Sequence, residues 1–220
     1  MKYDFPLVST YVADWTVLDA LREFGANAYD AETPGNTASI EYDKNKQRVV
    51  FKNPDTCLER NVLLLGGTSK SDDGNSIGHY GEGMKIAFLV LARAGYEVLV
   101  YNGRKEKWRP VMFESPKWRD KILRIEVIEG GRTKNDFEIH VEGIPIATWE
   151  SFKKLFLRLT PCKHAVRTDA GTILGDVEFA GRIYSKGVFV SHRQGFSFGY
   201  DLPYLQLNRD RKYTEDFDSH

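Results

Sequence analysis

The sequence has few cysteines and no excess of charge, and each absence excludes a class of protein. Only two cysteines, Cys57 and Cys162, occur in 220 residues, too few for a disulfide-stabilised secreted fold or a cysteine-rich metal site. We expect two reduced thiols in a cytoplasmic protein, with a single disulfide as the less favoured alternative. Lysine plus arginine and aspartate plus glutamate each number 31, so net charge indicates no attraction to nucleic acid or to an anionic membrane.

Long apolar runs are also missing. The two longest, residues 62–65 and 86–92, fall far below the roughly 20 residues that span a bilayer, and the start of the chain has no apolar signal core. We therefore expect no membrane association. The hydrophobic content of 41% and the aromatic content of 13% still allow a buried core, so the chain is globular rather than disordered.

Periodicity indicates an α+β fold. Apolar side chains recur at 3.6-residue spacing over residues 11–31, which predicts an amphipathic helix, and residues 83–94 predict an almost wholly apolar, buried helix. A third helix is expected from Thr148. The expected strands lie at residues 37–42, 48–52, 96–101, 109–113, 123–128, 137–141 and 182–190. Strands and helices do not alternate regularly, which favours helices on one face of a mixed, mostly antiparallel sheet over a doubly wound fold.

The sequence divides near residue 145. Residues 1–145 hold the first two helices and most of the strands. Residues 146–220 form a C-terminal helix and a β-rich extension, which packs either separately or into the same domain. Internal repeats are absent from both parts.

The polar face of the first helix carries the first candidate chemistry. Glu23, Asn27 and Asp30 follow one another at i, i+4 and i+7, so they share a narrow arc. An amide oxygen is a neutral ligand for Mg²⁺, and a carboxylate can accept a proton from an attacking water. A solvated helix face is the alternative, but this face lacks the lysine or arginine that would usually be mixed in.

A glycine-rich turn opens the second helix. It reads Gly78-His-Tyr-Gly81-Glu-Gly83-Met-Lys85. Glycines leave backbone N–H groups uncovered, and such groups at a helix start bind anions. Lys85 adds a positive charge that opposes the helix dipole unless a phosphate lies beside it. The turn is neither a Walker A loop nor a Rossmann fingerprint, because it lacks the Gly-Lys-Ser/Thr ending and follows a polar loop rather than a strand.

The polar loop before this turn offers further phosphate ligands. It begins Gly66-Gly-Thr68-Ser69-Lys70, and its hydroxyl and ammonium groups could reach phosphate oxygens. A plain surface loop is the alternative. A loop that closes over a ligand must also move when the ligand is absent, so both alternatives stay open.

These segments resemble those of the GHKL ATPase superfamily, which includes DNA gyrase B, Hsp90, histidine kinases and MutL. Glu23-x-x-x-Asn27-Ala-x-Asp30 resembles its N-box, and residues 65–85 resemble its ATP lid and second glycine box. The similarity covers residues 11–102 and is closest to MORC-like and phage-encoded members. It implies a Bergerat-type α/β sandwich that binds ATP and Mg²⁺.

The resemblance assigns a role to each candidate. Glu23 is expected as the general base, Asn27 as the Mg²⁺ ligand, and Asp30 as a support for the adenine end or the water network. The expected phosphate-lining residues are Gly78, Gly81, Gly83 and Lys85, and the expected lid residues are Thr68, Ser69 and Lys70.

The adenine-binding element departs from the family pattern. The family has Asp-x-Gly-x-Gly after its second strand, and here that place reads Asn53-Pro54-Asp55, without the glycines. Asn53 aligns best and Asp55 is the alternative. An asparagine oxygen can still accept a hydrogen bond from an exocyclic amino group.

The C-terminal part holds two candidate counterparts of the lysine that a following domain sends to the γ-phosphate in gyrase-like members. One surrounds Lys186 and the other is the charged tail with Arg209 and Arg211, which resembles phage-type members. We favour Arg209 or Arg211. An ion-pair cluster around Asp210 is an equal alternative.

Two functions are compatible with these observations. One is Mg²⁺-dependent ATP binding with slow hydrolysis, in which lid closure is coupled to conformational change or to ATP-dependent homodimer formation. The other is a non-hydrolysing interaction module, virus-encoded, that modulates a host ATPase or DNA-processing machine. A histidine-kinase catalytic domain is less favoured, because such domains lack a water-activating Glu at this spacing and a long β-rich tail.

Overall fold

The computed structural model describes residues 1–63 and 82–205 of the chain. It contains two compact units, Met1–Trp149 and a second that begins at Glu150. The helices of the first unit are α1 (Val17–Asp30) and α2 (Gly83–Arg93), with the 3-10 helix η1 (Arg60–Leu63), and α3 (Ile146–Lys153) spans the boundary. The strands of the first unit are β1 (Lys2–Val8), β2 (Ser39–Asp43), β3 (Arg48–Asn53), β4 (Val98–Asn102), β5 (Glu106–Ser115), β6 (Asp120–Glu129) and β7 (Phe137–Val141).

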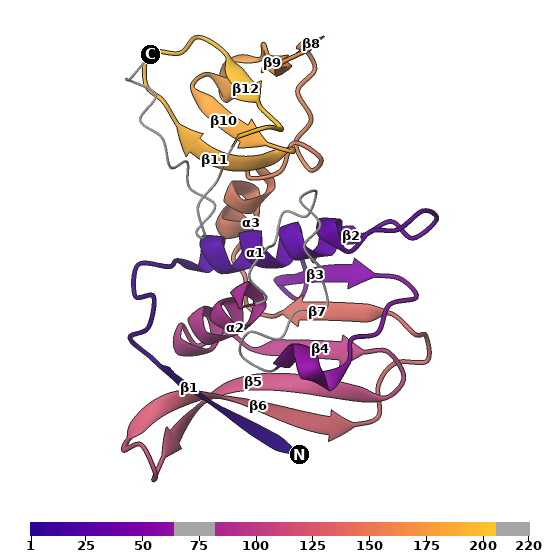
Figure 1. Ribbon diagram of the computed structural model, residues 1–220, viewed down its shortest axis with the longest axis vertical. Helices are drawn as coiled ribbons and strands as arrows, with labels where there is room; N and C mark the ends of the chain where they lie inside the picture. The colour runs from indigo at the N-terminus through magenta and orange to yellow at the C-terminus, as the bar shows by residue number, and fades with distance from the viewer. Residues whose placement is uncertain (64–81, 206–220) are drawn as a thin grey trace. The chain divides into compact units, whose positions relative to one another are not determined.

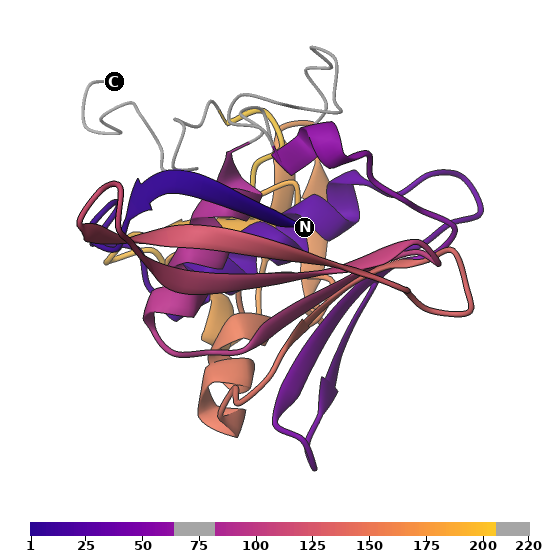
Figure 2. The same cartoon turned by 90° about the horizontal axis from the view of Figure 1, so that it is seen from below.

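The first unit is a seven-stranded sheet with two helices on one face (Figures 1 and 2). Its strand order is β1-β6-β5-β4-β7-β3-β2, and each described neighbouring pair is antiparallel. Helix α1 packs on β3, and α2 packs on β4, β5 and β6. The predicted α+β class, with helices on one face of a mostly antiparallel sheet, is therefore confirmed.

The core lies between the helices and the sheet. Phe24 of α1 contacts Phe51 of β3 edge-on, with ring centroids 5.6 Å apart, and Phe88 of α2 at 5.4 Å. All three are at most 2% exposed. This aromatic cluster fixes α1 and α2 beside each other over the sheet, as the apolar stripes of both helices predicted.

Helix α1 begins later than its apolar pattern predicted. Thr16 caps it through a reciprocal pair of bonds, in which the Asp19 amide donates to Thr16 Oγ1 at 3.3 Å and the Thr16 amide donates to Asp19 Oδ2 at 2.9 Å. The residues before Thr16 instead form turns. Helix α3 was also placed wrongly at its start, because Trp149 bonds to the Pro145 carbonyl and so Thr148 lies inside the helix.

The second unit contains a five-stranded sheet of order β11-β10-β12-β9-β8. Its elements are β8 (Ala165–Thr168), β9 (Gly171–Leu174), the 3-10 helix η2 (Val177–Phe179), β10 (Arg182–Ser185), β11 (Val188–His192) and β12 (Gly199–Asp201). Leu174, Phe179 and Tyr184 form its buried centre. The Tyr184 hydroxyl donates to the Lys154 carbonyl at 2.9 Å, which ties the sheet to the turns after α3.

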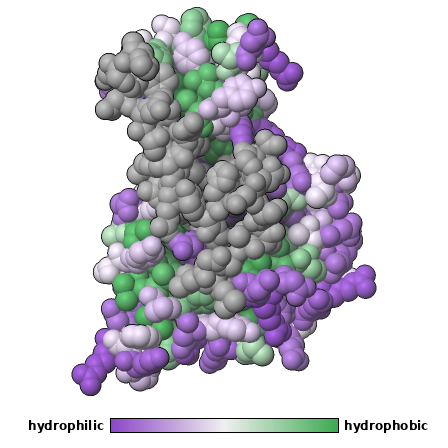
Figure 3. All heavy atoms as spheres, in the orientation of Figure 1, coloured by the Kyte–Doolittle hydropathy of each residue, from purple (hydrophilic) through white to green (hydrophobic). Residues whose placement is uncertain are grey.

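The remaining general features agree with the composition. Cys57 and Cys162 are both free thiols. Among the helices of residues 1–63 and 82–205, none is long and apolar enough to cross a membrane. On the face seen in Figure 3, polar side chains dominate the margins of the first unit, with apolar patches between them.

A buried carboxylate anchors the segment between β3 and η1 to the sheet. Glu106 is 4% exposed, and its Oε2 accepts from Arg60 Nε at 2.8 Å and Nη2 at 2.5 Å, while Oε1 accepts from Trp108 Nε1 at 2.8 Å. Beside it, the Asn102 side chain bonds both the amide and the carbonyl of Leu58, each at 2.8 Å. Burial works to raise the pKa of Glu106, but the bonds from Arg60, Trp108 and Asn102 outweigh it and hold the pKa below its ordinary value.

This geometry predicts a pH-dependent loss of stability in Glu106→Gln. The change removes a buried charge-assisted acceptor and should lower the free energy of unfolding by about 2 kcal/mol at pH 7. Because the folded-state pKa is lowered, this contribution is present above the unfolded-state pKa and is lost as pH falls through the folded value. Urea unfolding of both proteins should show a gap that closes as the pH drops below about 4. A gap of the same size at acidic and neutral pH contradicts the assignment.

Candidate functional site

The Glu23 carboxylate of α1 lies directly against Gly83, the first residue of α2. A methyl group built on Gly83 would stand 2.0 Å from Glu23 Oε1 and 2.4 Å from its Cδ, distances that no side chain tolerates without movement. Only glycine therefore leaves Glu23 in its place at the start of α2. The packing of α1 on α2 thus brings Glu23 of the first motif against Gly83, the last glycine of the second.

Asn27 is oriented by the same carboxylate. Its Nδ2 donates to Glu23 Oε1 at 3.0 Å, one helical turn away. A carboxylate only accepts hydrogen bonds, so the amide nitrogen must face it, and the amide oxygen faces elsewhere. Both side chains are half-buried. The oxygen of Asn27 is therefore the end of the amide that is turned away from Glu23.

Asn53 reaches α1 from the end of β3. It is 5% exposed, and its Nδ2 donates to the Ala28 carbonyl of α1 at 2.8 Å. Since a carbonyl also only accepts, the oxygen of this amide too is turned away from α1. Asn27 and Gly83 thus both lie beside Glu23, Asn53 contacts α1 at Ala28, and Asp30, half-buried, ends the helix.

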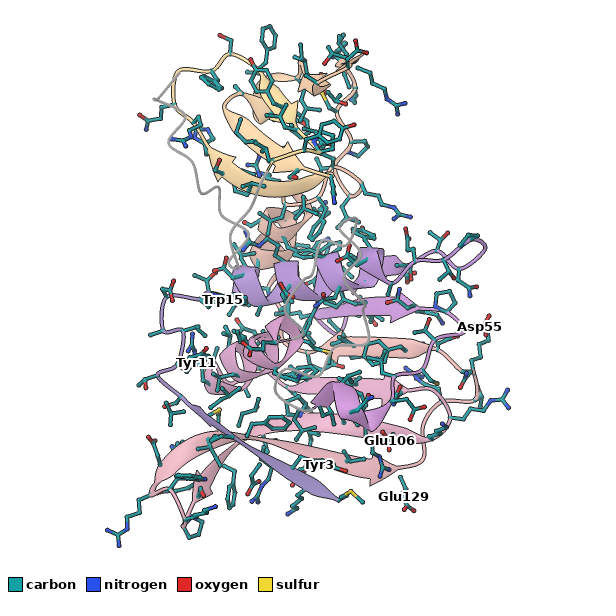
Figure 4. The ribbon with its side chains drawn as sticks, viewed as in Figure 1. Tyr3, Tyr11, Trp15, Asp55, Glu106 and Glu129 are labelled. Carbon is teal, nitrogen blue, oxygen red and sulfur yellow. The ribbon has the colours of Figure 1, made fainter. Side chains whose placement is uncertain are left out.

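Asp55, the alternative to Asn53, lies in a different environment. Its side chain is exposed, its φ is +46°, and its backbone N–H donates to Asp136 Oδ1 at 3.1 Å. Asp136 also pairs with Lys52 at 2.5 Å. Burial acts to raise the pKa of Asp136, but the Lys52 and Asp55 hydrogen bonds lower it overall. In Figure 4 Asp55 lies at the end of the sheet opposite Tyr11 and Trp15, whereas Asn53 bonds the Ala28 carbonyl of α1.

Lys85 leaves α2 on another side from Gly83. The two positions differ by about 200° around the helix axis. The Lys85 side chain is fully buried and lines a cavity together with Leu7 and Val8 of β1. Burial lowers the pKa of Lys85, and the neighbouring Glu82 carboxylate partly opposes that shift. A phosphate contact by Lys85 remains a prediction.

Seven candidates lie outside the described residues: Thr68, Ser69, Lys70, Gly78, Gly81, Arg209 and Arg211. Lys186 is described and occupies the β10–β11 turn of the second unit, with φ of +51°. The amide of the next residue, Gly187, donates to Asp201 Oδ1 at 3.0 Å, which holds that turn. Within the described part of the chain, no group of three or more His, Cys, Asp or Glu side chains is arranged to hold a metal ion.

Sequence reasoning missed the residue that organises the connection from β1 to α1. Arg93, in the last turn of α2, donates to the carbonyls of Ser9, Tyr11, Val12 and Trp15 at 2.7 to 3.2 Å. One signal could have found it, because Arg93 is the basic residue in the last turn of a mostly apolar helix and needs polar partners there.

Comparison with known proteins places few constraints on identity. The sequence matches no protein-family model. It is 28% identical over 228 residues to an uncharacterised protein of Mycoplasma pneumoniae, covering 96% of this chain and 91% of that protein. Two solved structures of the ATPase region of Saccharomyces cerevisiae topoisomerase II, one bound to ICRF-187 (dexrazoxane), align at 8% identity with TM-scores of 0.49 and 0.39. Each alignment covers 79% of this chain, which spans 62% and 61% of those chains, less than two thirds.

Proposed function

We propose that this chain binds ATP with Mg²⁺ along α1 and hydrolyses it slowly, as a GHKL-type ATPase. The observation that carries the proposal is the meeting of Glu23, Asn27 and Gly83. A carboxylate, an oriented amide oxygen and a helix start are brought into contact from two distant segments. The family resemblance points to the same three residues. Their proximity in the fold is an observation that does not depend on that resemblance.

In this proposal the phosphates of ATP bind at the start of α2. The amides of Lys85 and Ile86 bond back to the Glu82 carbonyl at 2.9 and 3.0 Å, so the amides of Gly83 and Met84 point out of the helix end, as at any helix start. The Glu82 side chain makes no cap bond there. Outward amides and the positive end of the helix dipole together suit an anionic phosphate.

The amide oxygen of Asn27 fits a magnesium ion. Its nitrogen is engaged by Glu23, and a hard, neutral oxygen is a suitable protein ligand for Mg²⁺, which keeps most of its waters and takes its other ligands from phosphates. When bound, the ion neutralises charge on the β- and γ-phosphates. Holding that oxygen in place is the contribution of α1.

Glu23 is positioned to accept the proton of the attacking water. In the proposed step, the water oxygen forms a bond to the γ-phosphorus as the bond from that phosphorus to the β-bridging oxygen breaks. The water proton passes to the Glu23 carboxylate and then to solvent, and ADP and inorganic phosphate leave. The half-buried position of Glu23 strengthens its hydrogen bond to that water relative to an exposed side chain.

Asn53 supplies the proposed contact to the base. With its nitrogen engaged by Ala28, its oxygen is an acceptor, which suits the exocyclic amino group of adenine and opposes the carbonyl oxygen of guanine. Asn53 stands where the family has aspartate, and Pro54 follows where flexibility would be expected. This departure favours the second function, a nucleotide-binding module without turnover that acts on another protein.

Glu23→Gln tests the catalytic assignment. Glutamine keeps the size of the side chain and an acceptor for Asn27 Nδ2, but it cannot take a proton. Phosphate release should fall by about 10²- to 10⁴-fold, while ATP affinity measured by calorimetry stays near that of the parent protein. Unchanged phosphate release in a folded variant refutes Glu23 as base. ATP binding without turnover in the parent protein supports the module instead.

Gly83→Ala tests the same assignment by displacing the Glu23 carboxylate without changing its chemistry. The added methyl meets the flexible end of the Glu23 side chain, so the carboxylate should swing away while α2 stays in place. Alanine in a helix is favoured over glycine by about 1 kcal/mol. We expect slower phosphate release with a Tm equal to or above that of the parent protein. A large fall in Tm means that the contact with Glu23 is rigid.

Asn53→Asp restores the residue that the family has at this place, but it should lower both the stability of the protein and its affinity for ATP. The new carboxylate oxygen would face the Ala28 carbonyl without a proton between them, where Asn53 now donates at 2.8 Å. Losing this buried bond should cost about 1–3 kcal/mol of stability at pH 7, and ATP affinity should fall as well. The deficit should shrink at acidic pH, where the aspartate is protonated and can donate. Tighter ATP binding by Asn53→Asp contradicts the assigned orientation.

A further inference from the structure

The sheet of the second unit has one covered edge and one uncovered edge. At the β11 edge, the Phe189 amide donates to the Leu155 carbonyl at 2.8 Å, and the Leu157 amide donates to the Gly187 carbonyl at 2.9 Å. The turns after α3 therefore cover that edge. At the other edge, β8 pairs with β9 alone among the described strands (Figure 1), and all four residues of β8 are exposed. A further strand can add to the sheet at β8.

The pairing of β8 with β9 determines which backbone groups of β8 point outward. The Gly175 amide donates to the His164 carbonyl at 2.8 Å, which marks these two opposing residues as a hydrogen-bonded pair. Because such pairs alternate along an antiparallel ladder, Val166 bonds toward β9, whereas Ala165 and Arg167 direct their N–H and C=O groups away from it. Strand β8 contains no proline and pairs with β9 without a register shift. Two donors and two acceptors are therefore turned toward a neighbouring strand.

An apolar row of side chains crosses this sheet and stops at β8. Ile183 of β10 lies opposite Tyr200 of β12, which lies opposite Ile173 of β9. Ile173 in turn lies opposite Val166 of β8. Directly opposite residues on neighbouring strands share one face of the sheet. Val166 is 60% exposed and Ile183 only 2%, so the row is open at its β8 end, where an apolar side chain of an added strand would cover it.

A second copy of β8 fits this edge in one register. When two antiparallel copies are centred on Val166, Ala165 of each copy lies opposite Arg167 of the other, and their outward groups form four hydrogen bonds. Val166 then faces Val166, and the exposed Lys163 of each copy lies opposite the exposed Asp169 of the other. A shift by one residue would set outward groups against inward ones. A shift by two would set Arg167 against Arg167 or against Lys163, and like charges directly opposite are destabilising.

We propose that two copies of this chain associate through β8 as a two-fold symmetric dimer. The two five-stranded sheets join, the apolar rows meet at Val166, and a Lys163–Asp169 ion pair forms at each end of the contact. The two Arg167 side chains lie diagonally, about 7–8 Å apart, and salt screens their exposed charges. The contact is short, so the dimer is reversible. The residues of the proposed nucleotide site belong to the first unit, so this association does not require ATP.

Sedimentation equilibrium of the full chain without nucleotide tests the association. We expect a monomer–dimer equilibrium between about 10 μM and 1 mM protein. Lys163→Glu and Asp169→Lys each set like charges opposite one another at both ends and should weaken the dimer by about tenfold. The double variant restores both ion pairs with reversed sign and should recover the Kd of the parent protein. A monomer at all concentrations, a dimer that forms only with ATP, or a double variant no tighter than the single ones overturns the proposal.

A cysteine at the two-fold axis tests the register independently. Val166→Cys sets two thiols opposite each other with Cα atoms about 4.5 Å apart, a distance that a disulfide spans. Arg167→Cys is the matched control, because its Cα atoms would lie diagonally at about 7–8 Å, too far for a disulfide. Mild oxidation should yield a covalent dimer with Val166→Cys, and not with Arg167→Cys or with the parent protein, whose Cys57 and Cys162 are present throughout. Equal cross-linking of both variants, or none in folded Val166→Cys, overturns the proposal.

Discussion

The absence of a side chain at Gly83 is the constraint on which the candidate site depends. Any Cβ there would occupy the position of the Glu23 carboxylate. Because it is missing, the Glu23 carboxylate can lie directly against the start of α2, and the Phe24, Phe51 and Phe88 cluster holds the two helices beside each other. The Glu23 carboxylate at the start of α2 and the aromatic cluster in the core thus both lie between α1 and α2.

Helix α1 also sets the direction of two amides. Asn27 donates to a carboxylate and Asn53 donates to a backbone carbonyl. Both acceptors lack a proton, so chemistry alone decides which end of each amide faces α1. The oxygen of each amide is therefore the end that is turned away from its acceptor, and the proposed contacts to a cation and to an exocyclic amino group use these two oxygens.

The sequence predicted the parts of the fold that depend on local pattern. The apolar stripe of α1, the almost wholly apolar α2 and the strands β2 and β3 all follow from residue patterns, and the structure has them within a few residues. The pairing of Glu23 with Gly83 needed the family resemblance, because it depends on contact between distant segments. The phosphate-lid residues and the arginines of the tail remain predictions.

Other features could not be predicted, because they depend on long-range contacts. Strand β1 alternates exposed and less exposed residues from Lys2 to Leu7, but its pairing with β6 and its break after Phe5 are set by the partner strand. The late start of α1 depends on Arg93, which binds the preceding carbonyls from far along the chain. Lys85 remains a predicted phosphate ligand, and no local pattern reveals that it also lines a cavity with Leu7 and Val8 of β1.

In the proposed function, α1 binds a metal–nucleotide complex through the amide oxygen of Asn27. Calorimetric titration with ATP, in Mg²⁺ and then in a chelator, tests it most directly in the parent protein and in Asn27→Ala. The account predicts saturable one-site binding that Mg²⁺ tightens, and a loss of about tenfold or more of that tightening in Asn27→Ala. No ATP binding by the parent protein, or the same effect of Mg²⁺ in both proteins, would contradict it.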